Sequence, residues 1–141
     1  MNLILKKVNS KNLYPLRSKV LRTDSNYEHC KFEGDERLDS IHIGVYKNQK
    51  IVAGVSLIKN KSTKIDLLNC YQLRGMCVLN DYQKKSIGQK LLEYSEETCR
   101  NLNVNYIWMN ARVAQLVELQ PSKLMVAGSN PVSRSKFFLP M

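Results

Sequence analysis

The sequence lacks the features that would place it in a membrane, outside the cell or around a metal ion. None of its 141 residues lies in an apolar run near the roughly 18 residues that a membrane-spanning helix needs. The apolar stretch after Met1 is too short for a secretory signal peptide. The four cysteines form no C-x-x-C pair, so neither a zinc site nor a redox dithiol is indicated. We expect reduced, mostly buried thiols, a cytoplasmic location, no metal and no membrane partner.

The composition that remains is that of one soluble domain with a basic surface. Apolar residues make up 43% and charged residues 24%, which suffices for a single core. The formal net charge is +10, and the basic residues are dispersed rather than gathered in one run. Such a surface attracts anions, so both phosphate-bearing small molecules and nucleic acid remain possible ligands.

Hydrophobic periodicity predicts elements in the order β-α-β-β-β-α-β. The expected strands are 3–8, 41–46, 51–58, 71–79 and 106–109, and the helices follow Ser10 and cover 91–102. A polar, irregular connection fills 23–40, and Lys47–Lys50 has the length of a hairpin loop. Gly75 inside a strand pattern predicts a bulge or a close backbone approach.

The segment Gln83–Gly88, Gln-Lys-Lys-Ser-Ile-Gly, joins the strand 71–79 to the helix that follows. The first N–H groups of a helix lack internal partners, and the helix dipole adds partial positive charge at the same end. A basic loop with a glycine at this position is therefore suited to hold phosphate. Taken alone the pattern is weak, because a solvated helix start has the same composition.

The context of this loop resembles the GNAT acetyltransferase superfamily. Its acetyl-CoA signature is Gln or Arg, two residues, Gly, one residue, then Gly or Ala, and Gln83, Ser86 and Gly88 occupy these positions. Similarity continues through residues 72–76 and 107–112, and upstream through Leu16-Arg17, Cys30-x-Phe32 and His42-x-Gly44, so that it covers 1–112. The resemblance implies an α/β (α+β) fold with a mixed, mostly antiparallel sheet flanked by helices.

The resemblance also implies the chemistry, which is transfer of an acetyl group from acetyl-CoA to a primary amine of a small molecule or protein. The amides of Lys84–Gly88 would wrap the pyrophosphate, and the exposed backbone of Met76–Leu79 would pair with the pantetheine arm. The expected cofactor-binding residues are Met76, Cys77, Val78, Gln83, Lys84, Lys85, Ser86, Ile87 and Gly88. A backbone donor near Cys77 or Val78 would stabilise the developing oxyanion.

No catalytic base or acid is assigned from the sequence. His42 is more simply explained as a hydrogen-bonded structural histidine, and Trp108 as a core residue. Ser86 departs from the signature glycine: if its φ must be positive, a serine there costs about 1 kcal/mol and weakens binding without excluding it. The acceptor amine and the oligomeric state cannot be inferred from this sequence.

The segment after Arg112 resembles a translated tRNA gene. Val113–Glu118 and Ala127–Val132 correspond to the two most uniform blocks of a bacterial tRNA gene, and 111–134 spans 24 codons, hence 72 nucleotides. We therefore expect an incomplete acetyltransferase domain at 1–112 and a non-native tail at 113–141, with a short helix and then irregular chain. Activity would be impaired by this truncation. The tail carries three basic residues and one acidic residue, so it accounts for +2 of the net charge.

Two other functions remain open. The chain could be a non-catalytic remnant that binds CoA, or a basic module that binds nucleic acid. The second alternative is the weaker one, because the sequence has neither an aromatic-rich strand motif nor the pattern of a recognition helix.

Overall fold

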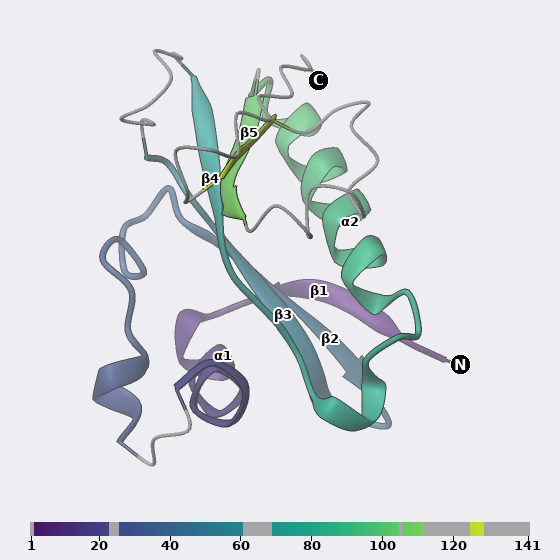
Figure 1. The fold of residues 1–141 in the computed structure, drawn as a ribbon. Helices are drawn as coiled ribbons and strands as arrows, with labels where there is room; N and C mark the ends of the chain where they lie inside the picture. Colours follow the sequence, from purple (N-terminus) through teal and green to yellow (C-terminus); the bar gives the residue numbers. More distant parts are fainter. Residues whose placement is uncertain (1, 23–25, 61–68, 105, 112–124, 129–141) are drawn as a thin grey trace. The chain divides into compact units, whose positions relative to one another are not determined.

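The computed structural model describes residues 2–22, 26–60, 69–104, 106–111 and 125–128. The chain packs as two units, which are described separately: Met1–Ile58 with Gly75–Ser95, and Lys59–Arg74 with Glu96–Met141. The boundary predicted at residue 112 lies inside the second unit. Figure 1 follows the chain by colour.

The first unit contains strands β1 to β3, the end of β4, helix α1 and the start of helix α2. Its elements are β1 (Ile4–Val8), α1 (Ser10–Arg17), η1 (Ser18–Arg22), η2 (Tyr27–Cys30), β2 (Ile41–Lys47), β3 (Lys50–Ile58), the end of β4 (Cys70–Val78), η3 (Asn80–Tyr82) and the start of α2 (Ile87–Asn101). The strands follow one another in the order β1-β2-β3-β4, and the pairs β1·β2 and β2·β3 are antiparallel. The predicted β-α-β-β-β-α-β order and the α/β class are confirmed.

The hairpin between β2 and β3 has a tighter turn than predicted. Lys47 pairs with Lys50, so only Asn48 and Gln49 form the turn, and their φ angles are +49° and +66°. A two-residue turn with positive φ at both residues has a backbone twist that matches the twist of the flanking strands.

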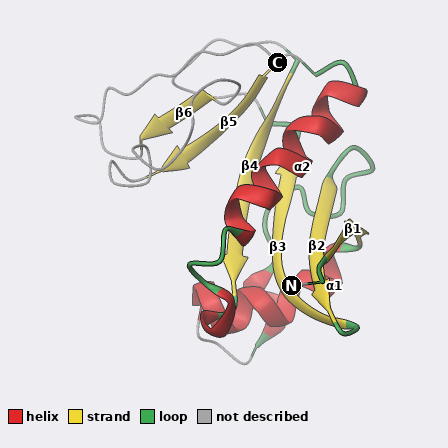
Figure 2. Ribbon diagram, turned by 90° about the vertical axis from the view of Figure 1, so that its right-hand side faces the viewer, coloured by secondary structure: helices red, strands yellow, loops and turns green. Residues whose placement is uncertain are grey.

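Helices α1 and α2 pack on opposite faces of this sheet. Cys77 of β4 is buried against Leu13 and Leu16 of α1, whereas Met76 faces α2 near Gly88. Successive side chains of a strand point to opposite faces, so neighbouring residues of β4 contact different helices. Figure 2 shows both helices beside the strands of this unit.

Pro15 lies inside helix α1. The helix begins at Ser10, so Pro15 is its sixth residue. A proline at such a position removes one backbone hydrogen bond and crowds the preceding turn. The regular helix ends at Arg17, and the chain continues as the π-helical turn η1.

The second unit contains the start of β4, the end of α2, β5 (Tyr106–Ala111) and β6 (Met125–Gly128), with the strand order β4-β5-β6. Both strand pairs are parallel, and α2 provides the crossover that a parallel β4·β5 pair requires. Trp108 is 6% exposed, and its indole N–H donates to the Asn60 carbonyl at 2.9 Å. Its predicted core role is confirmed.

Strand β6 corrects the expectation that the tail becomes irregular after a short helix. Met125–Gly128 pairs with Trp108–Ala111 in parallel register. A strand edge offers unpaired N–H and C=O groups, and an apolar segment such as Met-Val-Ala-Gly satisfies them by pairing. The short helix predicted after Arg112 falls outside the described residues.

Candidate cofactor site

The predicted phosphate loop lies in the first unit, between η3 and α2. Its residues from Gln83 to Ser86 are exposed. Ile87, by contrast, is 1% exposed and anchors the start of the helix in the core. The loop is therefore open to solvent and held at its end by a buried side chain.

Helix α2 begins at Ile87, one turn before Leu91. The Lys90 N–H donates to the Ser86 carbonyl at 3.1 Å, so the N–H groups of residues 87–89 have no carbonyl of the helix to bond. The first turn carries no acidic residue, although acidic side chains stabilise helix starts. Gly88 is thus the second residue of a helix whose first turn adds no negative charge at its positive end.

The loop backbone has left-handed residues at alternate positions. The φ angles are +59° at Lys84 and +62° at Ser86, whereas that of Lys85 is not positive. Alternation of right- and left-handed residues turns successive N–H groups toward one side and forms an anion-binding concavity. Since the φ of Ser86 is positive, the serine carries the strain of about 1 kcal/mol that was expected for this backbone conformation. The positive φ of Lys84 was not predicted, because a lysine gives no sequence signal for it.

Gln83 holds the turn together from within. Its side-chain Nε2 donates to the Val78 carbonyl at 3.0 Å and to Asn80 Oδ1 at 3.1 Å. Its backbone N–H donates to the Asn80 carbonyl at 3.2 Å. Gln83 therefore shapes the loop, and the donors available to a ligand begin at Lys84.

The side chains of two lysines lie near the ring of Tyr82, beside the loop. The ammonium groups of Lys47 and Lys85 lie 5.5 Å and 5.9 Å from the centroid of its ring, within the range of cation–π attraction. One lysine comes from the β2–β3 hairpin and the other from the loop. Lys84 adds a further exposed lysine to the loop.

Gly88 is not required by the packing of the protein. A Cβ built on Gly88 would meet only Met76 Sδ, at the ordinary contact distance of 3.7 Å. Glycine inside a helix costs about 0.5–1 kcal/mol relative to alanine. The fold itself therefore gives no reason for a glycine at this position.

The three strand residues predicted to bind the cofactor differ in their surroundings. Met76 and Val78 are half-buried. Cys77 is 3% exposed and points into the core, where burial raises the pKa of its thiol to about 11. Only the backbone of Cys77 can therefore take part in cofactor binding. The structure places these residues in the strand that leads into the loop, as predicted.

A buried polar cluster on the α1 side was not predicted. Arg17 is fully buried and makes a two-point contact with Asp35, at 2.6 Å and 3.1 Å. It also donates to the Cys30 carbonyl at 2.8 Å and to Ser56 Oγ at 2.7 Å. The available sequence signal was an arginine beside the apolar face of the first helix.

His42 belongs to the same cluster and is structural. Its Nε2 lies 2.9 Å from the Asp35 carbonyl, which can only accept, so Nε2 carries the proton and Nδ1 accepts from the Ser56 hydroxyl at 2.7 Å. The ring is 5% exposed, and burial lowers its pKa from the usual 6.5. His42 is therefore a buried, hydrogen-bonded histidine, as the sequence favoured.

Other features of the described residues add no second site. No group of three or more histidine, cysteine or acidic side chains there could hold a metal ion, and no helix there has both the length and the apolar character to cross a bilayer. The four cysteines are free and buried, as expected. A shallow concavity of about 470 Å³ is lined by Lys6, Lys7, Val8, Asn9, Asn12 and Tyr46, and it includes none of the predicted site residues.

The fold is that of an α/β protein in which a strand with a left-handed glycine, Gly75, leads into a basic turn and a helix. Residues 10–118 match the Acetyltransferase (GNAT) family. The chain therefore belongs to this family of acetyltransferases, whose members take the acetyl group from acetyl-CoA. The match extends six residues past the predicted boundary at Arg112.

Individual relatives agree with this assignment. The protein named Uncharacterized N-acetyltransferase YitI of Bacillus subtilis (strain 168) is 27% identical over 108 residues, which cover 77% of this chain and 72% of that protein. The solved structure of AAC(6')-Iy with a CoA-based bisubstrate analogue has a TM-score of 0.67 at 10% identity, covering 84% of this chain and 88% of that one. The ribosomal-protein-S18-alanine N-acetyltransferase of Escherichia coli has a TM-score of 0.64 at 15% identity, covering 83% and 72%. At such identities the structural matches establish the fold alone.

Proposed function

We propose that this acetyltransferase binds acetyl-CoA through the backbone of residues 84–88 and transfers its acetyl group to a primary amine of a small molecule or protein. The single observation that carries the proposal is Gly88, a glycine in the first turn of α2 that neither the backbone angle nor the packing requires. The positive φ angles of Lys84 and Ser86 turn N–H groups toward the same space. The nearby lysines complement the phosphate charge.

The remaining part of the cofactor would follow β4. From a diphosphate at the helix start, the pantetheine arm runs back along Val78, Cys77 and Met76, whose backbone supplies its hydrogen-bond partners. The amine attacks the thioester carbonyl, and a backbone N–H near Cys77 or Val78 stabilises the oxyanion of the tetrahedral intermediate. The C–S bond then breaks, and the proton that the amine nitrogen loses neutralises the departing thiolate, which yields the amide and free CoA. The chemistry depends on positioning rather than on a nucleophile of the protein, which agrees with the burial of the Cys77 thiol.

Calorimetric titration with acetyl-CoA tests the cofactor site. Wild-type protein should bind, and Gly88→Glu should abolish binding, because the new carboxylate would occupy the diphosphate position. Asn12→Asp is the matched control: it adds the same charge at an exposed position of α1 and keeps the oxygen that accepts from the Asn9 N–H. Absence of heat with wild-type protein, or unchanged heat with Gly88→Glu, would discard the site.

Turnover is a separate question from binding. We propose that activity is impaired by the tail, whose sequence resembles a translated tRNA gene rather than the end of an acetyltransferase domain. Release of free CoA in the presence of a panel of primary amines measures turnover, and binding without release would identify a non-catalytic CoA-binding protein. The nucleotide sequence of codons 105–141 tests the origin of the tail, since a cloverleaf within the reading frame is expected.

A further inference from the structure

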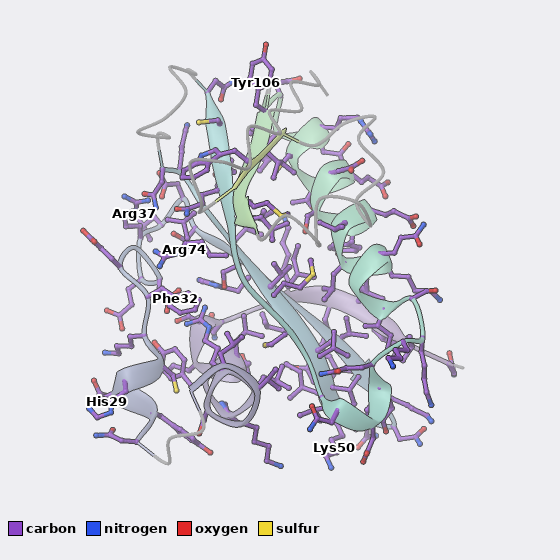
Figure 3. All side chains as sticks on the ribbon, viewed as in Figure 1. His29, Phe32, Arg37, Lys50, Arg74 and Tyr106 are labelled. Carbon is purple, nitrogen blue, oxygen red and sulfur yellow. The ribbon has the colours of Figure 1, made fainter. Side chains whose placement is uncertain are left out.

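The aromatic ring of Phe32 covers β4 at Gly75. Gly75 has a φ of +62°, and a Cβ built there would overlap the ring, with Phe32 Cζ at only 2.8 Å. Because Gly75 has no side chain, the ring lies directly against the strand backbone at this point. Figure 3 labels Phe32, on the segment that follows η2.

The position of the ring is set by Arg17. The guanidinium lies 3.9 Å from the ring centroid, in stacking distance, and its hydrogen bonds reach the Cys30 carbonyl and the Asp35 carboxylate on either side of Phe32 in the chain. Asp35 in turn accepts from the Phe32 N–H at 2.8 Å. The buried side chain of Arg17 thus contacts both ends of the segment 30–35 and the face of the Phe32 ring.

This arrangement is poorly explained by stability alone. Removing a guanidinium and a carboxylate from water offsets much of their attraction, and apolar residues of similar volume often stabilise a core better. The Arg17 Nε is also buried without a hydrogen-bond partner among the described residues. What the cluster provides is a fixed position for the segment 30–35, which has little regular structure of its own.

Gly75 directly precedes the strand residues along which the pantetheine arm is proposed to run. An arm that starts at the helix and runs back along β4 brings its acyl end to Gly75, where the Phe32 ring bounds the available space. The ring is half-buried, so part of it faces the space that an acyl group longer than acetyl would enter beyond Gly75.

We propose that Phe32 limits the donor to short acyl groups, and that Arg17 is the positioning residue that holds Phe32 in place. The inference rests on the proposed CoA site. Phe32→Ala removes the ring and opens space beside Gly75, whereas the loop 84–88 is untouched. Acyl-chain selectivity should therefore change without a change in affinity for CoA itself.

Calorimetric titration with CoA, acetyl-CoA and hexanoyl-CoA tests the inference without an acceptor. Wild-type protein should prefer acetyl-CoA by at least about tenfold, and Phe32→Ala should reduce this preference to less than about threefold at unchanged CoA affinity. Phe32→Leu, which perturbs packing less, should give an intermediate preference, and Arg17→Met should shift it in the same direction. Tyr27→Ala, an exposed aromatic residue of η2, is the matched control and should behave as wild type.

The outcomes separate the two proposals. A wild-type protein that binds no CoA refutes the cofactor site and this inference together. Variants at Phe32 that bind CoA but keep the wild-type preference, or a wild-type protein that binds hexanoyl-CoA as well as acetyl-CoA, overturn the role of Phe32 while the cofactor site stands.

Discussion

Replacement of Gly88 by alanine should move stability and cofactor affinity in opposite directions. The nearest atom to the new methyl group is Met76 Sδ at 3.7 Å, so the fold accepts it without strain. Alanine is favoured over glycine within a helix by about 0.5–1 kcal/mol, and toward the lower figure near a helix start. We expect Gly88→Ala to raise the free energy of unfolding by about 0.5 kcal/mol, measured by urea denaturation.

The same methyl group should obstruct acetyl-CoA. It would project from the first turn of α2 into the space proposed for the diphosphate, and it would lengthen the hydrogen bonds from the N–H groups of residues 87–89. The loss of charge-assisted hydrogen bonds of this kind corresponds to a weakening of about tenfold or more, or about 1.4 kcal/mol. Calorimetry on the same preparation measures it.

The pair of measurements is decisive because misfolding cannot imitate it. A stabilised variant with weakened binding places a ligand at the backbone of Gly88. A destabilised variant would show that the glycine serves packing or backbone strain, and a stabilised variant with unchanged affinity would show that the diphosphate lies elsewhere; either result refutes the reasoning.

Three further predictions concern the buried groups. Asp35→Asn removes the counter-charge of the buried Arg17 and should cost about 3–5 kcal/mol in urea unfolding, whereas Asp39→Asn, at a half-exposed ion pair, should cost less than about 1 kcal/mol. Burial lowers the pKa of His42, so below about pH 6.5 the unfolded chain binds a proton at this residue more readily than the folded protein does. The free energy of unfolding should therefore fall as the solution is acidified below that pH. His42→Gln should flatten this pH dependence. The Cys77 thiol, whose pKa is about 11, should react with a disulfide reagent at about pH 8 only when the protein is unfolded, and immediate reaction in the native state would contradict its burial.

The regular elements were predictable because each follows from a local pattern. The spacing of apolar residues predicted the two helices and all strands up to β5. Gly75, in the first predicted strand after the hairpin, indicated the irregular backbone that its positive φ confirms. At the start of α2 only Ile87 is anchored in the core, because Gln89 and Lys90 are polar and exposed.

The cluster around Arg17 could not be predicted in the same way. Its members come from α1, the segment after η2, β2 and β3, and a sequence shows no sign that residues so far apart share one site. Strand β6 was also missed, because its pairing depends on an edge of β5 that exists only in the folded chain. Neither kind of tertiary contact can be predicted from hydrophobic periodicity or from secondary-structure propensity.

The bonds made by Gln83 bear on the kinetics of association. Since the turn 80–83 is closed by hydrogen bonds to Val78 and Asn80, its conformational entropy is given up when the chain folds and not when the coenzyme arrives. Rapid-mixing experiments should then show a single association phase whose rate rises linearly with CoA concentration and falls with added salt.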